Sequence, residues 1–256
     1  MPIRDVLARM YLRRLRAQLR GRELPKHVAV IMDGNRRWAR AQGFADARVG
    51  HDYGADHVSS LLRWSAAAGI DHVTIFVCST ENLIARDQEE VRNLLTMMER
   101  MVARELAVPD PQWQVHLAGL IDALPDTTAR ALKEAEESTS ACATGRHLTL
   151  AIGYGGRQEV VDAVRSLMQY EAAAGVSPAE LAQRLTTDDI ARHLYTSGQP
   201  EPDLIIRTSG EQRLSNFLLW QSAHSQLYFC EAYWPAFREI DLLRALRGWA
   251  THRNTI

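Results

Sequence analysis

Short apolar runs alternate with longer amphipathic segments along most of the chain. Strands are predicted at 27–32, 73–78, 113–118, 148–152 and 203–207, with a sixth at 227–229. Apolar positions at helical spacing predict helices at 38–41, 55–68, 89–106, 127–138 and 158–173, with short helices opening at Pro178 and Asp188. Strands that alternate with helices are typical of a parallel sheet covered by helices. We therefore expect an α/β fold with a mostly parallel six-stranded sheet.

Residues 1–24 predict a separate amphipathic basic helix. Leu7, Tyr11, Leu15 and Leu19 recur at four-residue steps among arginines, and Pro25 ends the segment. The narrow stripe contains no Trp or Phe, which favours packing on the rest of the protein. Peripheral contact with an anionic membrane is the alternative. Residues 25–256 contain no repeat or long linker, so we expect them to form a single domain.

Composition narrows the classes of function. The net charge of −1 provides no field for nucleic acid, and no aromatic stacking platform accompanies the basic helix, so no nucleic-acid partner is expected. The three cysteines are widely spaced, which predicts buried, reduced thiols rather than disulfides or a zinc site. No apolar run approaches the ~18 residues of a membrane span. We expect a cytoplasmic protein.

Three predicted strands run directly into polar segments: 33–38, 79–82 and 207–213. Loops at the carboxyl ends of parallel strands share one rim of the sheet, where ligands bind. A carboxylate, a glycine and adjacent guanidinium groups suit a phosphate ester bound with Mg²⁺. Asp33-Gly34-Asn35 alone would be an ordinary turn, and Arg207 and Arg213 alone could be surface charges. Their placement after buried strands favours a site.

Several common chemistries are disfavoured. The chain lacks a Walker-type lysine loop, and the glycines of 153–157 lack dinucleotide spacing, so this segment is expected to form a tight turn. No Ser, His and acid arrangement follows a nucleophile-elbow pattern. His51 follows Gly50 and would either cap a helix or bind phosphate; the sequence leaves both open.

Four blocks in order carry a resemblance to a known family. They are HVAVIMDGNRRWA at 27–39, STEN at 79–82, YGGR at 154–157 and DLIIRTSGEQRLSNFLLW at 203–220. From about residue 25 to about 250 the chain resembles cis-prenyltransferases, whose best-known members are undecaprenyl diphosphate synthases. The resemblance implies a Mg²⁺-dependent homodimer with an apolar product tunnel. It also implies condensation of an allylic diphosphate with isopentenyl diphosphate and loss of pyrophosphate.

The same resemblance assigns roles to residues. Asp33 would assist departure of the allylic diphosphate through Mg²⁺, and Asn82 occupies the position implicated in proton removal. The residues around the allylic diphosphate would be Gly34, Asn35, Arg36, Arg37, Trp38 and His51. Isopentenyl diphosphate would be held by Arg207, Arg213, Leu214 and Ser215. Ser79, Thr80 and Glu81 would lie near Asn82, and Arg86 would contribute a further substrate contact.

Some positions depart from the family pattern. Gln226 stands where the family has a metal-binding glutamate near the dimer interface, Leu83 replaces a tryptophan, and Arg86 is displaced by one position. These changes suggest an altered second-substrate pocket. Val77 stands where long-chain enzymes have alanine, and its larger side chain predicts a C10 or C15 product. The segments 195–202 and 208–210 (Thr-Ser-Gly) also resemble short-chain, actinobacterial members.

Two alternatives remain open. Gln226, Leu83 and Arg86 are compatible with irregular head-to-middle coupling of dimethylallyl or geranyl units into a lavandulyl-type skeleton. A non-catalytic subunit of a prenyltransferase complex is the alternative from another class. Retention of Asp33 and Asn82 argues against the second alternative.

Overall fold

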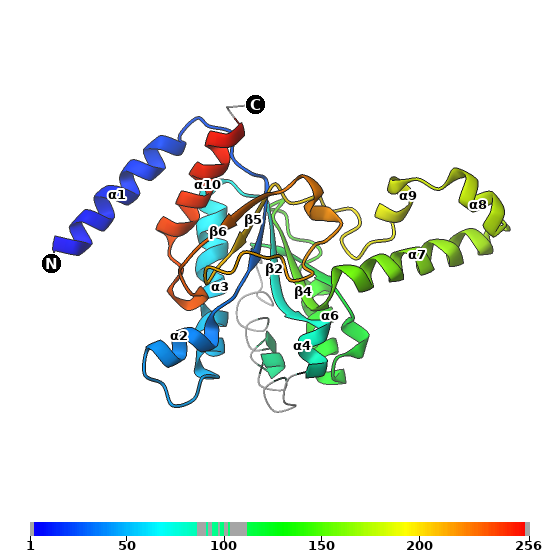
Figure 1. Cartoon of the computed structure of the whole chain (residues 1–256), viewed down its shortest axis with the longest axis horizontal. Coiled ribbons are helices and arrows are strands. Elements are labelled where there is room, and N and C mark those ends of the chain that lie inside the picture. Colours follow the sequence, from blue (N-terminus) through cyan, green and yellow to red (C-terminus); the bar gives the residue numbers. More distant parts are fainter. Residues whose placement is uncertain are drawn as a thin grey trace.

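The structure is a computed structural model that describes residues 3–85, 91, 94–96, 98–99, 102 and 112–253. Its centre is a fully parallel six-stranded sheet in the order β3-β4-β2-β1-β5-β6 (Figure 1). The strands are β1 (His27–Ile31), β2 (His72–Ser79), β3 (Gln114–Ala118), β4 (His147–Tyr154), β5 (Leu204–Arg207) and β6 (Gln226–Phe229). All six predicted strands are present, with ends shifted by at most two residues, and the predicted α/β fold is confirmed.

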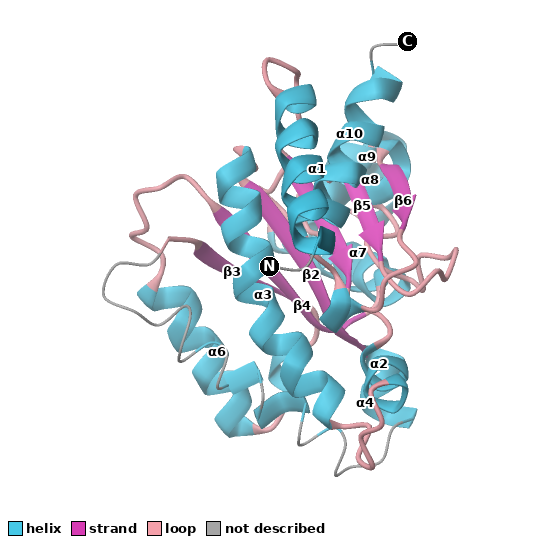
Figure 2. Ribbon diagram, turned by 90° about the vertical axis from the view of Figure 1, so that its left-hand side faces the viewer, coloured by secondary structure: helices cyan, strands magenta, loops and turns pink. Residues whose placement is uncertain are grey.

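The alternation of side chains along β1 divides the core into two parts. Val28 and Val30 belong to the larger cluster, which is covered by α3 (Val49–Ala68), α6 (Asp126–Ser138) and α10 (Glu239–Arg253). Figure 2 shows α3 and α6 over this face of the sheet. Ala29 and Ile31 belong to a smaller cluster with Phe217. Because the strands are buried on both faces, their sequences read as continuous apolar runs.

The remaining helices agree with the prediction at most positions. They are α1 (Ile3–Leu19), α2 (Asn35–Ala41), α4 (Thr80–Ala85), α7 (Gly156–Ala173), α8 (Pro178–Arg184) and α9 (Thr187–Ala191). Most of the predicted helix 89–106 lies outside the described residues, although its expected apolar positions Leu94, Leu95, Met98 and Val102 are buried. The helix α10 was not predicted from the sequence; its buried side chains include Leu242, Leu246 and Trp249.

The two ends of the N-terminal helix α1 differ in their exposure to solvent. Leu15 and Leu19 are buried, and α1 lies along α10, where Arg16 Nη2 meets Glu239 Oε1 at 2.6 Å (Figure 1). The other end of the helix exposes Leu7 and the neighbouring Val6 and Met10. Tyr11 also packs against the larger core cluster. Packing therefore accounts for Tyr11, Leu15 and Leu19 of the predicted apolar stripe but not for Leu7.

Two further expectations concern cysteines and membrane spans. The three cysteines all lie in the described part of the chain and form no disulfide there, but only Cys78 and Cys230 are buried; Cys142 is half-buried, which corrects the prediction for this residue. Within the described part of the chain, every helix is too short or too polar to cross a bilayer.

Candidate active site

The rim between β1 and β5 brings the first and last polar segments together. These strands are neighbours, and the chain leaves them toward opposite edges of the sheet, which creates a crevice at their carboxyl ends. The Asp33 N–H donates to Thr208 Oγ1 at 2.9 Å, and the Thr208 hydroxyl donates to the Asp33 carbonyl at 2.7 Å. This double link holds the two strand ends in register.

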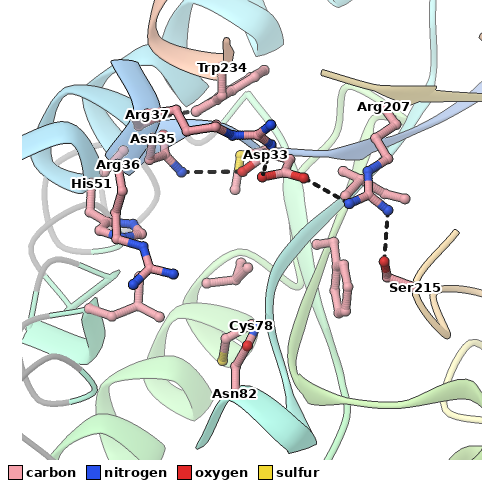
Figure 3. Close-up of a pocket in the computed structure, with 18 of the residues that line it drawn as sticks. Asp33, Asn35, Arg36, Arg37, His51, Cys78, Asn82, Arg207, Ser215 and Trp234 are labelled. Atoms are coloured by element: carbon pink, nitrogen blue, oxygen red, sulfur yellow. Dashed lines mark hydrogen bonds and ion pairs between the residues drawn. The ribbon is translucent and has the colours of Figure 1, made fainter. Parts of the chain in front are cut away.

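Arg207 is the buried cation of the crevice. Its side chain is 5% exposed, and its Nη2 donates to Asp33 Oδ2 at 2.7 Å (Figure 3). Its Nη1 donates to the Arg213 carbonyl at 2.6 Å and to Ser215 Oγ at 2.7 Å. One guanidinium therefore fixes both the carboxylate after β1 and the segment after β5.

Arg37 reaches the same carboxylate from α2. Its Nη2 donates to Ser209 Oγ at 2.7 Å and to Asp33 Oδ1 at 3.3 Å, and its Nη1 donates to Glu211 Oε1 at 3.3 Å. Burial opposes ionisation of Asp33, but the hydrogen bond and charge of Arg207, helped by Arg37, outweigh it. The pKa of Asp33 is consequently held below its ordinary value, and the carboxyl is ionised at neutral pH.

A cavity of about 490 Å³ opens beside these residues. The predicted site residues that line it are Asp33, Gly34, Asn35, Arg36, Arg37, His51, Val77, Asn82, Arg207, Arg213 and Ser215. Apolar side chains complete the wall: Ala55, Val58, Phe76, Leu94 and Met98. Figure 3 shows Asn82 and Cys78 across the cavity from Asp33. The cavity thus combines ionic groups with apolar surface.

The apolar lining and Trp234 were not predicted from the sequence. Leu94 and Met98 recur at helical spacing and are buried, but spacing gives no sign of whether a buried side chain meets protein or a cavity. Trp234 is also buried, and its Nε1 donates to the Gly54 carbonyl at 2.7 Å. A lone tryptophan in an unassigned segment carried no signal.

Comparison with known proteins decides the family. The sequence profile described as "Putative undecaprenyl diphosphate synthase" matches residues 31–256. The chain belongs to this prenyltransferase family. It is 62% identical to an isoprenyl transferase of Streptomyces fradiae over 251 residues, covering 98% of this chain and 97% of that protein. It is 50% identical to the (2Z,6E)-farnesyl diphosphate synthase of Mycolicibacterium smegmatis, covering 98% and 96% of the two chains.

A solved structure agrees with this assignment. The lavandulyl diphosphate synthase of Lavandula x intermedia, crystallised with dimethylallyl diphosphate, superposes with a TM-score of 0.82. The two proteins share 33% sequence identity, and the match covers 89% of this chain and 95% of that one. The predicted membership of the cis-prenyltransferase family is therefore confirmed, and the chain is a prenyltransferase.

The second motif of this prenyltransferase begins on a strand and continues into a helix, which corrects the expected loop. Ser79 is the last residue of β2, and Thr80, Glu81 and Asn82 form the first turn of α4. Ser79 Oγ accepts the Asn82 N–H at 3.0 Å. Asn82 lines the cavity, whereas the other three residues do not.

Asn216 joins the second, third and fourth motifs. Its Nδ2 donates to Glu81 Oε1 at 3.1 Å, and its Oδ1 accepts the Arg157 N–H at 2.9 Å. Its carbonyl accepts the Gly156 N–H at 2.8 Å. The expected strand-to-helix turn is present, because β4 ends at Tyr154 and α7 begins at Gly156, with Gly155 between them. The first turn of α7 is thereby attached to the loop that carries Arg213 and Ser215.

Several predicted residues lie away from the cavity. Trp38 packs against Phe44 and Tyr53, with ring centroids 5.8 and 4.9 Å away, and Leu214 packs against the smaller core cluster. Gln226 pairs with Leu204 at the amino end of the sheet, the end opposite Arg207. Arg86 lies outside the described residues. Substrate contact by Trp38, Leu214 and Arg86, and metal contact by Gln226, stay predictions.

His51 lies in the first turn of α3 and lines the cavity, so it does not cap the helix as one alternative supposed. Its place beside Arg36 in Figure 3 suits the other alternative, contact with phosphate.

The side chains of the site suit Mg²⁺ only when substrate phosphate oxygens supply further ligands. Among the described residues there is no group of three His, Cys, Asp or Glu side chains that could hold a metal. Asp33 is a single carboxylate, 29% exposed at the cavity, with Arg207 Nη2 2.7 Å from its Oδ2 and Arg37 Nη2 3.3 Å from its Oδ1. Magnesium commonly takes one or two carboxylates plus waters and substrate phosphate oxygens, so Asp33 fits this use.

Proposed function

We propose that this prenyltransferase condenses an allylic diphosphate with isopentenyl diphosphate, giving a Z-configured C10 to C15 diphosphate and pyrophosphate. The observation that carries the proposal is the Asp33–Arg207 pair beside a cavity that also has apolar walls. An ionic entrance suits two diphosphates, and an apolar wall suits their hydrocarbon chains. The short-chain relatives at 50% identity support the product class.

The reaction replaces one bond at the allylic C1. The bond from C1 to the diphosphate oxygen breaks, a new bond forms from C1 to C4 of isopentenyl diphosphate, and a proton leaves C2 of the acceptor. Negative charge grows on the departing diphosphate, and fixed cations stabilise it. Arg37, Arg36 and His51 would bind that diphosphate. Mg²⁺ held by Asp33 would supply further neutralisation of the departing group.

The acceptor would bind on the β5 side of the cavity. Arg213 and Ser215 line this side, and Arg207 fixes both of them through its hydrogen bonds. Because Arg207 is buried and already oriented, it need not reorganise when the diphosphate arrives. Asn82 lies across the cavity from Asp33 (Figure 3). An amide is not basic enough to take the proton, so the released pyrophosphate would accept it, and Asn82 would orient the groups involved by hydrogen bonding.

Product length would be limited by Val77 and its neighbour Phe76. Both line the cavity, and Phe76 is held in place by stacking on Phe217 with centroids 4.7 Å apart. A fixed aromatic ring beside a β-branched side chain leaves little freedom for the wall to yield to a longer chain. We therefore expect synthesis to stop at C15.

The second candidate is irregular coupling of two allylic units. Its support is the structural similarity to lavandulyl diphosphate synthase, together with Leu83 and Gln226 at departing positions. The identity to the (2Z,6E)-farnesyl diphosphate synthase is 50%, compared with 33% to the lavandulyl diphosphate synthase, and this favours regular condensation.

Assembly and location form part of the same proposal. A homodimer is supported by the edge strand β6, where Leu227 is 41% exposed. Gln226 lies beside it, far from Asp33 of its own chain, so a metal contact by Gln226 would have to cross the dimer.

We place the enzyme in the cytoplasm. Peripheral membrane contact would use the exposed Leu7 and Met10 of α1, with arginines around them.

Product analysis tests the reaction. Purified protein with Mg²⁺ is incubated with dimethylallyl, geranyl or farnesyl diphosphate, each with and without isopentenyl diphosphate, and the products are identified by mass spectrometry. We expect C10 or C15 products that require isopentenyl diphosphate. Products from dimethylallyl diphosphate alone would establish irregular coupling instead. Absence of product in every combination would overturn the proposal and favour a non-catalytic subunit.

A further inference from the structure

Ser209 has a backbone conformation that serine rarely adopts. Its φ is 76°, and it is followed by Gly210 at 75°. Residues other than glycine are strained in this left-handed region, and such strain persists only where the surrounding structure maintains it. The Ser209 N–H donates to the Ala232 carbonyl at 2.8 Å, and the Gly210 N–H to the Cys230 carbonyl at 2.9 Å. Glycine at 209 would make the same backbone bonds without strain, so they do not explain the side chain.

The hydroxyl of Ser209 makes the shortest contact of the Arg37 guanidinium. Arg37 Nη2 lies 2.7 Å from Ser209 Oγ, compared with 3.3 Å to the nearest oxygens of Asp33 and Glu211. The guanidinium also lies 5.7 Å from the Tyr233 ring centroid. The two carboxylates partly neutralise Arg37 and compete with a phosphate for it. The hydroxyl is neutral, so it orients the guanidinium without reducing its charge.

The site of the hydroxyl is rigid. Ser209 is 8% exposed, and a Cβ at Gly34 would lie 3.0 Å from the Ser209 Cβ. Arg37 is 42% exposed, and an exposed arginine without a fixed partner samples many orientations. Removing the hydroxyl would release the guanidinium toward Glu211, whose carboxylate is 31% exposed.

We propose that Ser209 is a positioning residue for the allylic diphosphate, because it holds Arg37 at the cavity in an orientation that glycine could not impose. The inference rests on the proposed function, in that an allylic diphosphate is the ligand of Arg37. It does not depend on which acceptor follows.

Two substitutions separate the hydroxyl from the backbone. Ser209→Ala removes the hydroxyl and retains the strain, whereas Ser209→Gly removes both. We expect each variant to raise the KM for the allylic diphosphate about tenfold, as for a lost hydrogen bond to a charged group that keeps weaker partners. The KM for isopentenyl diphosphate should stay within about twofold. If only backbone geometry mattered, Ser209→Ala would match the unmodified enzyme, and that result would overturn the inference.

A double-mutant cycle tests whether Ser209 acts through Arg37. In an Arg37→Met background, Ser209→Ala should change allylic affinity by less than about twofold, because the guanidinium that it orients is gone. The same tenfold effect in both backgrounds would show that Ser209 does not act through Arg37. Ser209→Gly gives the same comparison should the alanine variant fold poorly, because glycine accepts the left-handed conformation.

The affinity should also be measured with geranyl S-thiolodiphosphate, which binds without reacting, by isothermal titration calorimetry in the presence of Mg²⁺. This readout remains informative if the enzyme does not use isopentenyl diphosphate. Weaker binding by both variants alongside absent condensation would overturn the proposed function and support the role of Ser209. Unchanged binding in both variants would overturn the role of Ser209 whatever the reaction.

Discussion

Replacement of Arg207 by methionine tests the central pair of the site. Methionine is similarly long and flexible but carries no charge, so the change removes the ion pair with less loss of packing. Three hydrogen bonds would be lost, to Asp33, to the Arg213 carbonyl and to Ser215. Asp33 would remain partly buried, with Arg37 as its remaining cation at 3.3 Å.

The expected loss of stability follows from the burial of the pair. Breaking a buried ion pair by removing one partner costs about 3–5 kcal/mol, because the other charge stays buried. Arg207 is 5% exposed, but Asp33 is 29% exposed and keeps a weak contact with Arg37. We therefore expect the low end of that range, about 3 kcal/mol. Loss of one preorganised cation predicts a fall in kcat/KM of about 10²–10³-fold.

The pH dependence of activity provides a separate check. The pKa of Asp33 is below its ordinary value in the folded protein, so the ionised carboxylate stabilises the fold at neutral pH. That contribution is present above the ordinary pKa and is lost as the pH falls through the lowered folded value. Without Arg207, burial would raise the pKa of Asp33. The acidic limb of the kcat/KM profile should then move to higher pH.

Arg213→Met is the matched control. Arg213 is 64% exposed and pairs with Glu211 at 2.8 Å, so its loss should lower the free energy of unfolding by less than about 1 kcal/mol. It should raise the KM for isopentenyl diphosphate and leave the acidic limb unchanged. Urea unfolding and pH profiles compare the two variants. Equal urea midpoints for Arg207→Met and Arg213→Met would refute the reasoning about a buried Arg207–Asp33 pair. An unchanged acidic limb of the kcat/KM profile in Arg207→Met would refute it as well.

Three further predictions concern chain length, pH and membranes. Val77→Ala should lengthen the product by at least one isoprene unit, as read by mass spectrometry, because it enlarges the cavity where the chain grows. Burial lowers the pKa of His27 to about 4, so the unfolded chain takes up the proton first as the pH falls below about 6.5. In urea unfolding, the free energy of unfolding should fall by about 3 kcal/mol between pH 7 and pH 4, and His27→Gln should not show this fall. Combined substitution of Leu7 and Met10 by serine should abolish sedimentation with anionic vesicles and leave turnover unchanged.

Each of these three has an outcome that contradicts it. An unchanged product length in Val77→Ala would remove Val77 from the control of chain length. An equal pH dependence in His27→Gln would show that other groups govern the acid response. Retained vesicle binding would exclude the exposed end of α1 as the membrane contact. Serine substitution is preferable to deletion of residues 1–22, because deletion would also remove Leu15 and Leu19 from the core.

The sequence by itself determined the strands, most helices, the family and the position of the polar segments. Buried parallel strands leave continuous apolar runs, and a parallel sheet places the residues after its strands on one rim. That Asp33 and Arg207 lie on the same rim could therefore be predicted from the order of strands and polar segments alone. The missed α10 was within reach of the same argument, because its buried Leu242, Leu246 and Trp249 recur at helical spacing.

Only the tertiary structure decided which groups meet. Periodicity states that Met98 is buried, but whether it faces protein or a cavity depends on the strand opposite. Gln226 follows a motif in sequence yet lies at the far end of the sheet, since parallel strands carry their first and last residues to opposite edges. The left-handed Ser209 is set by its pairing with the segment before Tyr233, which no local pattern encodes. Hydrogen-bond partners and backbone strain depend on segments distant in the chain, and these appear only once the chain is folded.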